Sequence, residues 1–176
     1  MTRPQYAGSD DASTTACCTV PGVAKPRWLD ERQAHVWQAY LHLNHQLYGA
    51  LEDQLLRDAG LSGADYAVLV PLSAAPGGVL RARELGKEII WDRSRLSHQV
   101  RRMETRGLVV REECSEDARG SMVRLTRAGR RAIEGAAPEH AETVRRCFFD
   151  LLSDKELGTL ASVFDRVLEN LQREKP

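Results

Sequence analysis

Over most of this chain the hydrophobic positions recur with the period of an α-helix. Between residues 30 and 59 they return every three or four residues, which predicts one long amphipathic helix capped by Asp30. Near the other end the spacing alternates between three and four residues, through Leu157, Leu160, Phe164, Val167 and Leu171. That spacing is typical of a helix seam, so the last helix is expected to pack along another helix.

Shorter helices are expected between these two. Ser62 and Asp65 have the spacing of a capping box, which predicts a second helix over 63–74. Pro71 lies inside that helix and is expected to kink it or to remove one hydrogen bond. After the helix-breaking sequence APGG, a short third helix is expected over 82–89.

The next segment combines a helix with a β-hairpin. Asp92 is placed to cap a fourth helix, and Gly107 is placed to end it. Beyond it, the β-branched runs LVVREEC and SMVRLT flank the polar SEDARG, which predicts a β-hairpin. A fifth helix is expected after Thr126, interrupted near Pro138 and continuing to Leu151. Helix, turn, helix and hairpin in this order predict a mainly α-helical winged helix-turn-helix fold.

Composition excludes several classes of protein. The chain has 176 residues, 42% of them hydrophobic and 28% charged, as in an ordinary folded domain. Its apolar runs are far shorter than the roughly 20 residues of a membrane-spanning helix. The N-terminus lacks the apolar core of a secretory signal, so a cytoplasmic location is expected. The four cysteines include no CxxC pair and are expected to be reduced thiols.

Charge is distributed unevenly, although the formal net charge is zero. Residues 81–131 carry 14 Lys or Arg against 8 Asp or Glu, while the rest of the chain carries 11 against 17. On a helical wheel of the fourth helix, one stripe is apolar and consists of Leu96, Val100 and Met103. The opposite side is polar and without acidic residues, and consists of Ser94, His98, Arg101, Arg102 and Thr105.

A solvated charged face is the plain explanation of such a helix. The order of the elements favours DNA binding instead. Positive charge on a helix-turn-helix and hairpin is typical of phosphate binding, and an α-helix fits the DNA major groove.

The segment SRLSHQVRRMETRGLVVREECSEDARGSMVRLTRAG, residues 94–129, resembles the MarR (multiple antibiotic resistance regulator) family of bacterial transcription regulators. It looks like that family's recognition helix and its RGLV-R helix exit. Asp117 and Arg119 resemble that family's D-x-R wing pattern. Leu125, Thr126 and Gly129 resemble its LT-x-x-G entry to the next helix. The flanking helices also fit in number and order, so the resemblance covers 28–173.

The resemblance implies an obligate homodimer with interlocked N- and C-terminal helices. The corresponding regions would be an unstructured tail over 1–26, a dimerisation helix over 27–60, a winged helix-turn-helix lobe over 61–128 and C-terminal dimerisation helices over 129–176. Such dimers bind a pseudo-palindromic operator, one half-site per recognition helix. Most are repressors, and many release DNA when a small aromatic or phenolic ligand binds.

Carried over by residue, the resemblance assigns DNA contacts to the fourth helix and the wing. Those expected at the major groove are Ser94, Arg95, Ser97, His98, Arg101 and Arg102. Arg106 at the helix exit is expected to bind phosphate, and Arg119 is expected to reach the minor groove. Asp117 is expected to orient the wing, or else to be an ordinary turn residue.

Other residues suggest an effector site. Helices that line the effector pocket in such proteins would carry Trp37, Tyr40, His45, Tyr66 and His140. Aromatic residues at helical spacing are more often plain core, so these assignments compete with a packing role. A metal site at the histidines of the first helix is disfavoured, because no matching Cys or carboxylate partner lies nearby in sequence. No cofactor is expected.

Three other functions compete with a ligand-controlled DNA-binding regulator. A peroxide-sensing regulator of the same fold would use Cys17, Cys18 or Cys147, although a thiol on an apolar helical stripe is usually inert. A winged-helix adaptor that binds protein instead of DNA is disfavoured by the arginine-rich helix. An enzyme is excluded by the absence of any nucleophile elbow, phosphate loop or HExxH motif.

Overall fold

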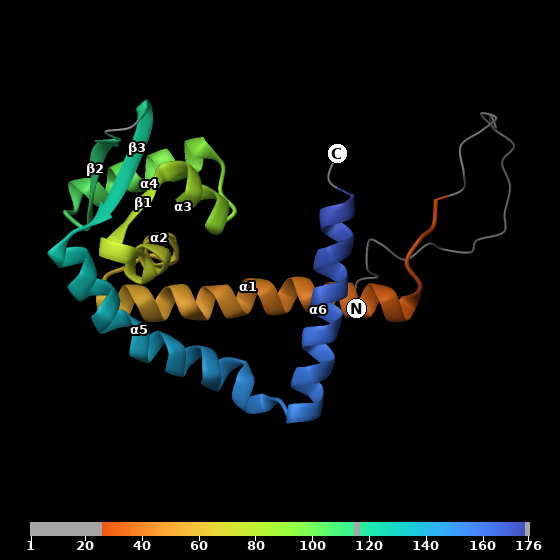
Figure 1. Ribbon diagram of the computed structural model, residues 1–176. Coiled ribbons are helices and arrows are strands. Elements are labelled where there is room, and N and C mark those ends of the chain that lie inside the picture. The colour runs from red at the N-terminus through yellow and green to blue at the C-terminus, as the bar shows by residue number, and fades with distance from the viewer. Residues whose placement is uncertain (1–25, 115–116, 175–176) are drawn as a thin grey trace, which may run out of the picture. The chain divides into compact units, whose positions relative to one another are not determined.

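The computed structural model describes residues 26–114 and 117–174, and it leaves the side chains of 113–120 undescribed. The chain divides into two units, the first ending at Gly49 and the second beginning at Ala50. Figure 1 shows the elements in order, which are α1 (Glu31–Ala59), α2 (Gly63–Ala74), η1 (Pro76–Gly78), β1 (Val79–Arg81), α3 (Ala82–Glu88), α4 (Arg93–Thr105), β2 (Val109–Cys114), β3 (Asp117–Leu125), α5 (Arg127–Cys147), η2 (Phe149–Leu151) and α6 (Asp154–Arg173).

The N-terminal caps of the helices lie where the sequence predicts them. Ser62 and Asp65 form a complete capping box at the start of α2. Asp92 accepts a hydrogen bond from the backbone N–H of Arg95 at 2.9 Å, which caps α4. Thr126 caps α5 in the same way. Side-chain oxygens at these positions satisfy backbone donors that have no partner within the helix.

The sheet has one strand more than the expected hairpin. Its order is β1-β3-β2, and both pairings are antiparallel. Leu80 pairs with Val123, and Val109 pairs with Leu125. The third strand, β1, has three residues directly after a glycine-rich turn, which is too short for alternation to be visible in the sequence. The fold is therefore a winged helix-turn-helix with a three-stranded wing sheet.

Two expectations about the fifth helix are wrong. Helix α5 runs without a break from Arg127 to Cys147 with Pro138 inside it, and it ends before Leu151, which belongs to the 3₁₀ turn η2. Buried residues lie on both sides of the proline, among them Ala136 and Thr143. Tertiary packing therefore holds the helix across the hydrogen bond that proline removes.

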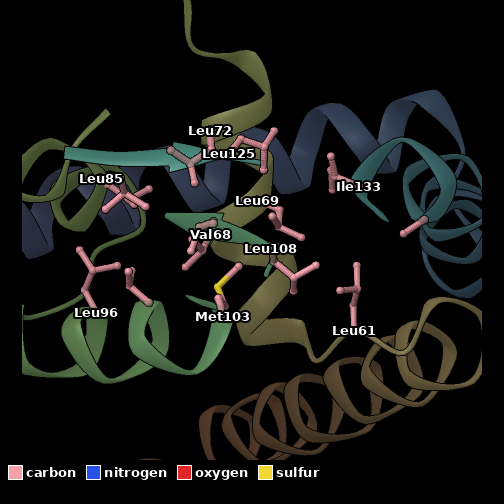
Figure 2. Packing of buried hydrophobic residues seen from close by; sticks show 14 of the residues in the cluster. Leu61, Val68, Leu69, Leu72, Leu85, Leu96, Met103, Leu108, Leu125 and Ile133 are labelled. Carbon is pink, nitrogen blue, oxygen red and sulfur yellow. The ribbon is translucent and has the colours of Figure 1, made fainter. Parts of the chain in front are cut away.

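The core lies where α2, α3, α4, the sheet and α5 meet (Figure 2). Figure 2 shows Leu69 and Leu72 of α2, Leu85 of α3, Leu96 of α4 and Leu125 of the sheet as members of this cluster. The predicted stripe of α4, Leu96, Val100 and Met103, is buried, at 4% exposure or less. Burying one large aliphatic side chain stabilises a fold by about 1.5–3 kcal/mol, so this stripe fixes which side of α4 faces outward.

Helix α6 differs from these elements because none of its residues is buried. The seam that the sequence predicts is present on one side of it, and Phe164, Val167 and Leu171 are 49%, 53% and 53% exposed.

Among the described residues, no helix is long and apolar enough to cross a membrane.

Candidate nucleic-acid interface

Helix α4 presents the polar face that the sequence predicts. Its outward residues are all exposed, and they are Ser94, Arg95, Ser97, His98, Arg101, Arg102 and Thr105. Because the buried stripe lies on the other side, this face is fixed toward solvent over more than three helical turns. Its three arginines and its hydroxyls are hydrogen-bond donors suited to phosphates and guanine edges.

Arg95 stacks against an aromatic ring at the beginning of the helix. Its guanidinium carbon lies 4.2 Å from the centroid of the half-buried Trp91 ring. A cation over an indole face is attracted by the ring quadrupole. The stack therefore limits the directions in which Arg95 can point.

The flank of α4 that faces the wing is held by Arg111 of β2. One guanidinium nitrogen of Arg111 donates to the carbonyl oxygen of Ser97 at 2.6 Å, and another pairs with Glu104 at 3.2 Å. The backbone N–H of Arg111 also donates to Glu104, at 2.8 Å. Sequence reasoning counted Arg111 among the basic residues but gave it no role, because nothing local indicates that β2 lies beside α4.

The opposite flank is held by Asp65 of α2. Gln99 of α4 donates to one oxygen of this buried carboxylate at 2.7 Å, and Arg106 pairs with the other. Arg106 also donates to the carbonyl oxygen of Gly60 at 2.6 Å. The expectation that Arg106 binds phosphate stays a prediction, and the structure adds that its guanidinium already has two partners inside the protein.

A cavity of about 520 Å³ lies beside α4, between α3, the helix and the sheet. Its walls include the apolar side chains of Trp91, Leu96, Val100 and Val123. The basic residues that line it are Arg81, Arg83, Lys87, Arg93 and Arg111. Basic side chains from α3, α4 and the strands thus surround this cavity on the flank of α4 that carries Ser97, and sequence reasoning did not predict it.

The wing is strengthened by a bidentate ion pair between its strands. Arg124 of β3 donates to both carboxylate oxygens of Glu112, at 2.7 and 2.8 Å. These bonds lower the pKa of Glu112 and raise that of Arg124. The backbone of Asp117 and Arg119 belongs to β3, and both side chains lie outside the described residues.

Two of the five predicted effector residues contact each other. The ring centroids of Tyr66 and His140 lie 4.3 Å apart, and Nδ1 of His140 is 3.1 Å from Oε1 of the buried Gln54. Burial raises the pKa of Tyr66 and lowers that of His140, because each loses water that would stabilise its charged form. Gln54 is a member of this cluster that the sequence did not single out.

The other three predicted effector residues lie in the unit that ends at Gly49. Trp37 and Tyr40 are stacked with ring centroids 5.5 Å apart, and both are more than 40% exposed. His45 is exposed on the same helix.

Comparison with known proteins identifies the family. A family model, that of the MarR family, matches residues 59–120. The structure is similar to that of Sco3205, a MarR family transcriptional regulator from Streptomyces coelicolor solved in complex with DNA. The two chains are 39% identical in sequence, with a TM-score of 0.80. The match covers 84% of this chain and 92% of Sco3205. The chain belongs to the MarR family.

Other members of the MarR family are also similar. AbsC, from Streptomyces coelicolor, is 37% identical with a TM-score of 0.80, covering 85% of this chain and all of its own. PcaV from the same organism, solved with its natural ligand, is 25% identical with a TM-score of 0.62, covering 79% of this chain and 93% of that one. A search of curated proteins gave no match.

Membership of the MarR family makes the chain a transcriptional regulator and not an enzyme. Of the cysteines considered for redox sensing in this family, Cys17 and Cys18 lie outside the described residues, and Cys147 is half-buried at the end of α5. No group of three or more potential metal ligands is found among the described residues.

Proposed function

We propose that this MarR family protein is a repressor that binds a pseudo-palindromic operator as a homodimer and is released by a small aromatic or phenolic ligand. The observation that carries the proposal is the exposed, acid-free polar face of α4 above its buried stripe. The similarity to Sco3205, whose structure contains DNA, supports the same use of the fold. The protein acts in the cytoplasm.

The proposed DNA contacts differ in kind. Arg101 and Arg102 are suited to guanine edges in the major groove, while Ser94, Ser97 and His98 are suited to phosphates or bridging waters. Arg119 enters the minor groove, and Asp117 orients the wing. The basic residues of the cavity beside α4 add positive charge near the DNA backbone.

The proposed homodimer explains apolar surface that one chain leaves exposed. On α1, Val36, Tyr40 and Leu43 are 61%, 48% and 48% exposed and are spaced by four and three residues. The seam of α6 has the same spacing and similar exposure. Stripes of this kind are typical of helices that pack against another copy.

The proposed effector site includes Tyr66 and His140, which form a half-buried aromatic pair with a polar partner in Gln54. Trp37, Tyr40 and His45 lie in the unit that ends at Gly49, and their role as effector contacts stays a prediction. The ligand-bound structure of PcaV, a family member 25% identical to this chain, supports a small-molecule effector.

The proposal is tested with Arg101→Ala and the matched variant Arg173→Ala. Each removes one exposed arginine, the first from α4 and the second from the end of α6. DNA fragments selected by the wild-type protein provide the probe. Arg101→Ala is expected to weaken binding about 5- to 150-fold and to relax the preference at one base pair, whereas Arg173→Ala is expected to bind as the wild type does. Equal binding by all three proteins would contradict the proposal.

A further inference from the structure

The carboxylate of Asp65 connects two helices that are distant in sequence. It lies in the first turn of α2 and is 2% exposed. Its partners on α4 are Gln99 and Arg106, which are 34 and 41 residues away along the chain. A buried charge this far from solvent is stable only when donors surround it.

Four hydrogen-bond donors surround this carboxylate. Oδ1 accepts from Gln99, and Oδ2 accepts from the backbone N–H and the hydroxyl of Ser62, both at 2.9 Å, and from Arg106. Four donors match the roughly four acceptor positions of an ionised carboxylate. The capping box alone would need only the bonds to Ser62. The other two hold α4.

The two partners on α4 are placed to fix its orientation. Gln99 and Arg106 are seven residues apart, so they lie on the same flank, two helical turns from each other. This flank lies between the buried stripe and the exposed face that carries Arg102. Apolar packing alone permits small rotations of a helix, whereas charge-assisted hydrogen bonds at two points along one flank have strict geometry.

We propose that Asp65 is a positioning residue for the recognition helix, setting the rotation of α4 through Gln99 and Arg106 and thereby the discrimination between DNA sequences. The proposal rests on the DNA-reading function proposed above. Asp65 contacts no DNA. Removing its charge leaves the phosphate-binding residues in place, so sequence-independent binding is retained while discrimination falls.

The test compares Asp65→Asn, Arg106→Gln and Gln99→Met with Glu112→Gln, which breaks an ion pair of the wing away from α4. Gln99→Met keeps the capping box intact, so the proposal remains testable if Asp65→Asn does not fold. The probes are a duplex selected by the wild-type protein and a scrambled duplex of the same composition. Affinities are measured over a salt series, well below the unfolding temperature of each variant.

The ratio of the two affinities is expected to fall about tenfold in the first three variants. Affinity for the scrambled duplex and the salt slope are expected to stay unchanged in Asp65→Asn and Gln99→Met. The double variant Asp65→Asn, Arg106→Gln is expected to be no worse than either single one, because both remove the same link. Glu112→Gln is expected to keep the ratio.

Two results would overturn the proposal. A lower unfolding temperature with an unchanged ratio would make Asp65 a purely structural residue. A salt slope reduced by about one in Arg106→Gln but not in Asp65→Asn would make Arg106 a phosphate contact instead. A wild-type protein that prefers no sequence would refute the proposed function itself, before the variants are compared.

Discussion

The winged lobe, made of the elements from α2 to β3 (63–125), and helix α6 differ in how far their apolar residues are buried. In the lobe, Leu85, Val100 and Met103 are at most 1% exposed, and the helices and strands cover one another within a single chain. In α6, no residue is buried, although its apolar spacing is as regular as that of any helix in the chain. The lobe buries its apolar residues within one chain, whereas α6 leaves its apolar residues exposed, and the proposed homodimer would cover them. Stability and assembly are therefore expected to depend on different parts of the molecule.

The largest effect is expected from a charge on the seam of α6. Val167→Asp places a carboxylate on the apolar stripe, and the proposed dimer is expected to dissociate because a desolvated charge has no partner there. DNA affinity is expected to fall about 100-fold or more, because two linked lobes bind far more tightly than one. Sedimentation and gel shifts measure both.

The matched control for that variant is Ser162→Asp, on the opposite side of α6. It adds the same charge and is expected to leave mass and affinity unchanged. A Val167→Asp protein that remains dimeric with full affinity would show that the seam is not the interface.

A smaller effect, confined to stability, is expected from Leu85→Ala in the lobe. Leu85 is 0% exposed, and truncating a buried leucine costs about 2–5 kcal/mol. Denaturant unfolding is expected to show this loss, while sedimentation of the folded variant stays that of the wild type. Dissociation of the folded variant would mean that the stability of the lobe and the dimerisation of the chain are not independent.

Ile90→Gly is expected to stabilise the lobe. Helix α3 ends in a Schellman motif, with Trp91 N–H bonded to Gly86 O and Ile90 N–H to Lys87 O. Ile90 occupies the left-handed position at φ 57° and is 85% exposed, so glycine would relieve strain and lose little burial. The gain is expected to be about 1 kcal/mol in the free energy of unfolding.

Helix α4 provides the reverse experiment, because it ends in the same motif with Gly107 at φ 69°. A Cβ at this position would meet nothing within 4 Å, so Gly107→Ala tests the backbone alone. It is expected to destabilise the lobe by about 1 kcal/mol. Changes of the same sign in both variants would refute the explanation by strain.

The smallest effect concerns His140, whose pKa burial lowers from the ordinary value of 6.5. As the pH falls from 7 toward 5, the unfolded chain takes up the proton first, so the folded state loses stability. In His140→Gln this part of the pH dependence is expected to disappear. Urea unfolding at a series of pH values measures this dependence. If the free energy of unfolding changed equally with pH in the wild type and in His140→Gln, the prediction would be contradicted.

The sequence predicts well what is decided locally. Residues within a few positions of one another decide the caps at Ser62 and Asp92, the start of α5 after Thr126 and the two sides of α4. The strand β1 is missed because its three residues pair only with a strand more than 40 positions later. The continuous α5 is missed because packing outweighs Pro138.

In the candidate site, too, some features follow from local sequence and others from tertiary contacts. The exposed residues of α4 follow from periodicity, whereas the bonds of Arg111 to Ser97 and of Arg106 to Asp65 require tertiary contacts that no local pattern encodes. A helix-exit arginine is thus equally consistent, in the sequence, with phosphate binding and with an internal ion pair.

The proposed DNA reading by a dimer is tested by selecting genomic DNA fragments with the full-length protein and footprinting the fragments that it retains. The predicted result is a shared inverted repeat with half-site centres about 10 base pairs apart, or a multiple of one helical turn. Protection is expected over both half-sites at once. Retained fragments without a common inverted repeat, or protection of a single half-site by a monomer, would contradict the central claim that α4 reads DNA as one half of a dimer.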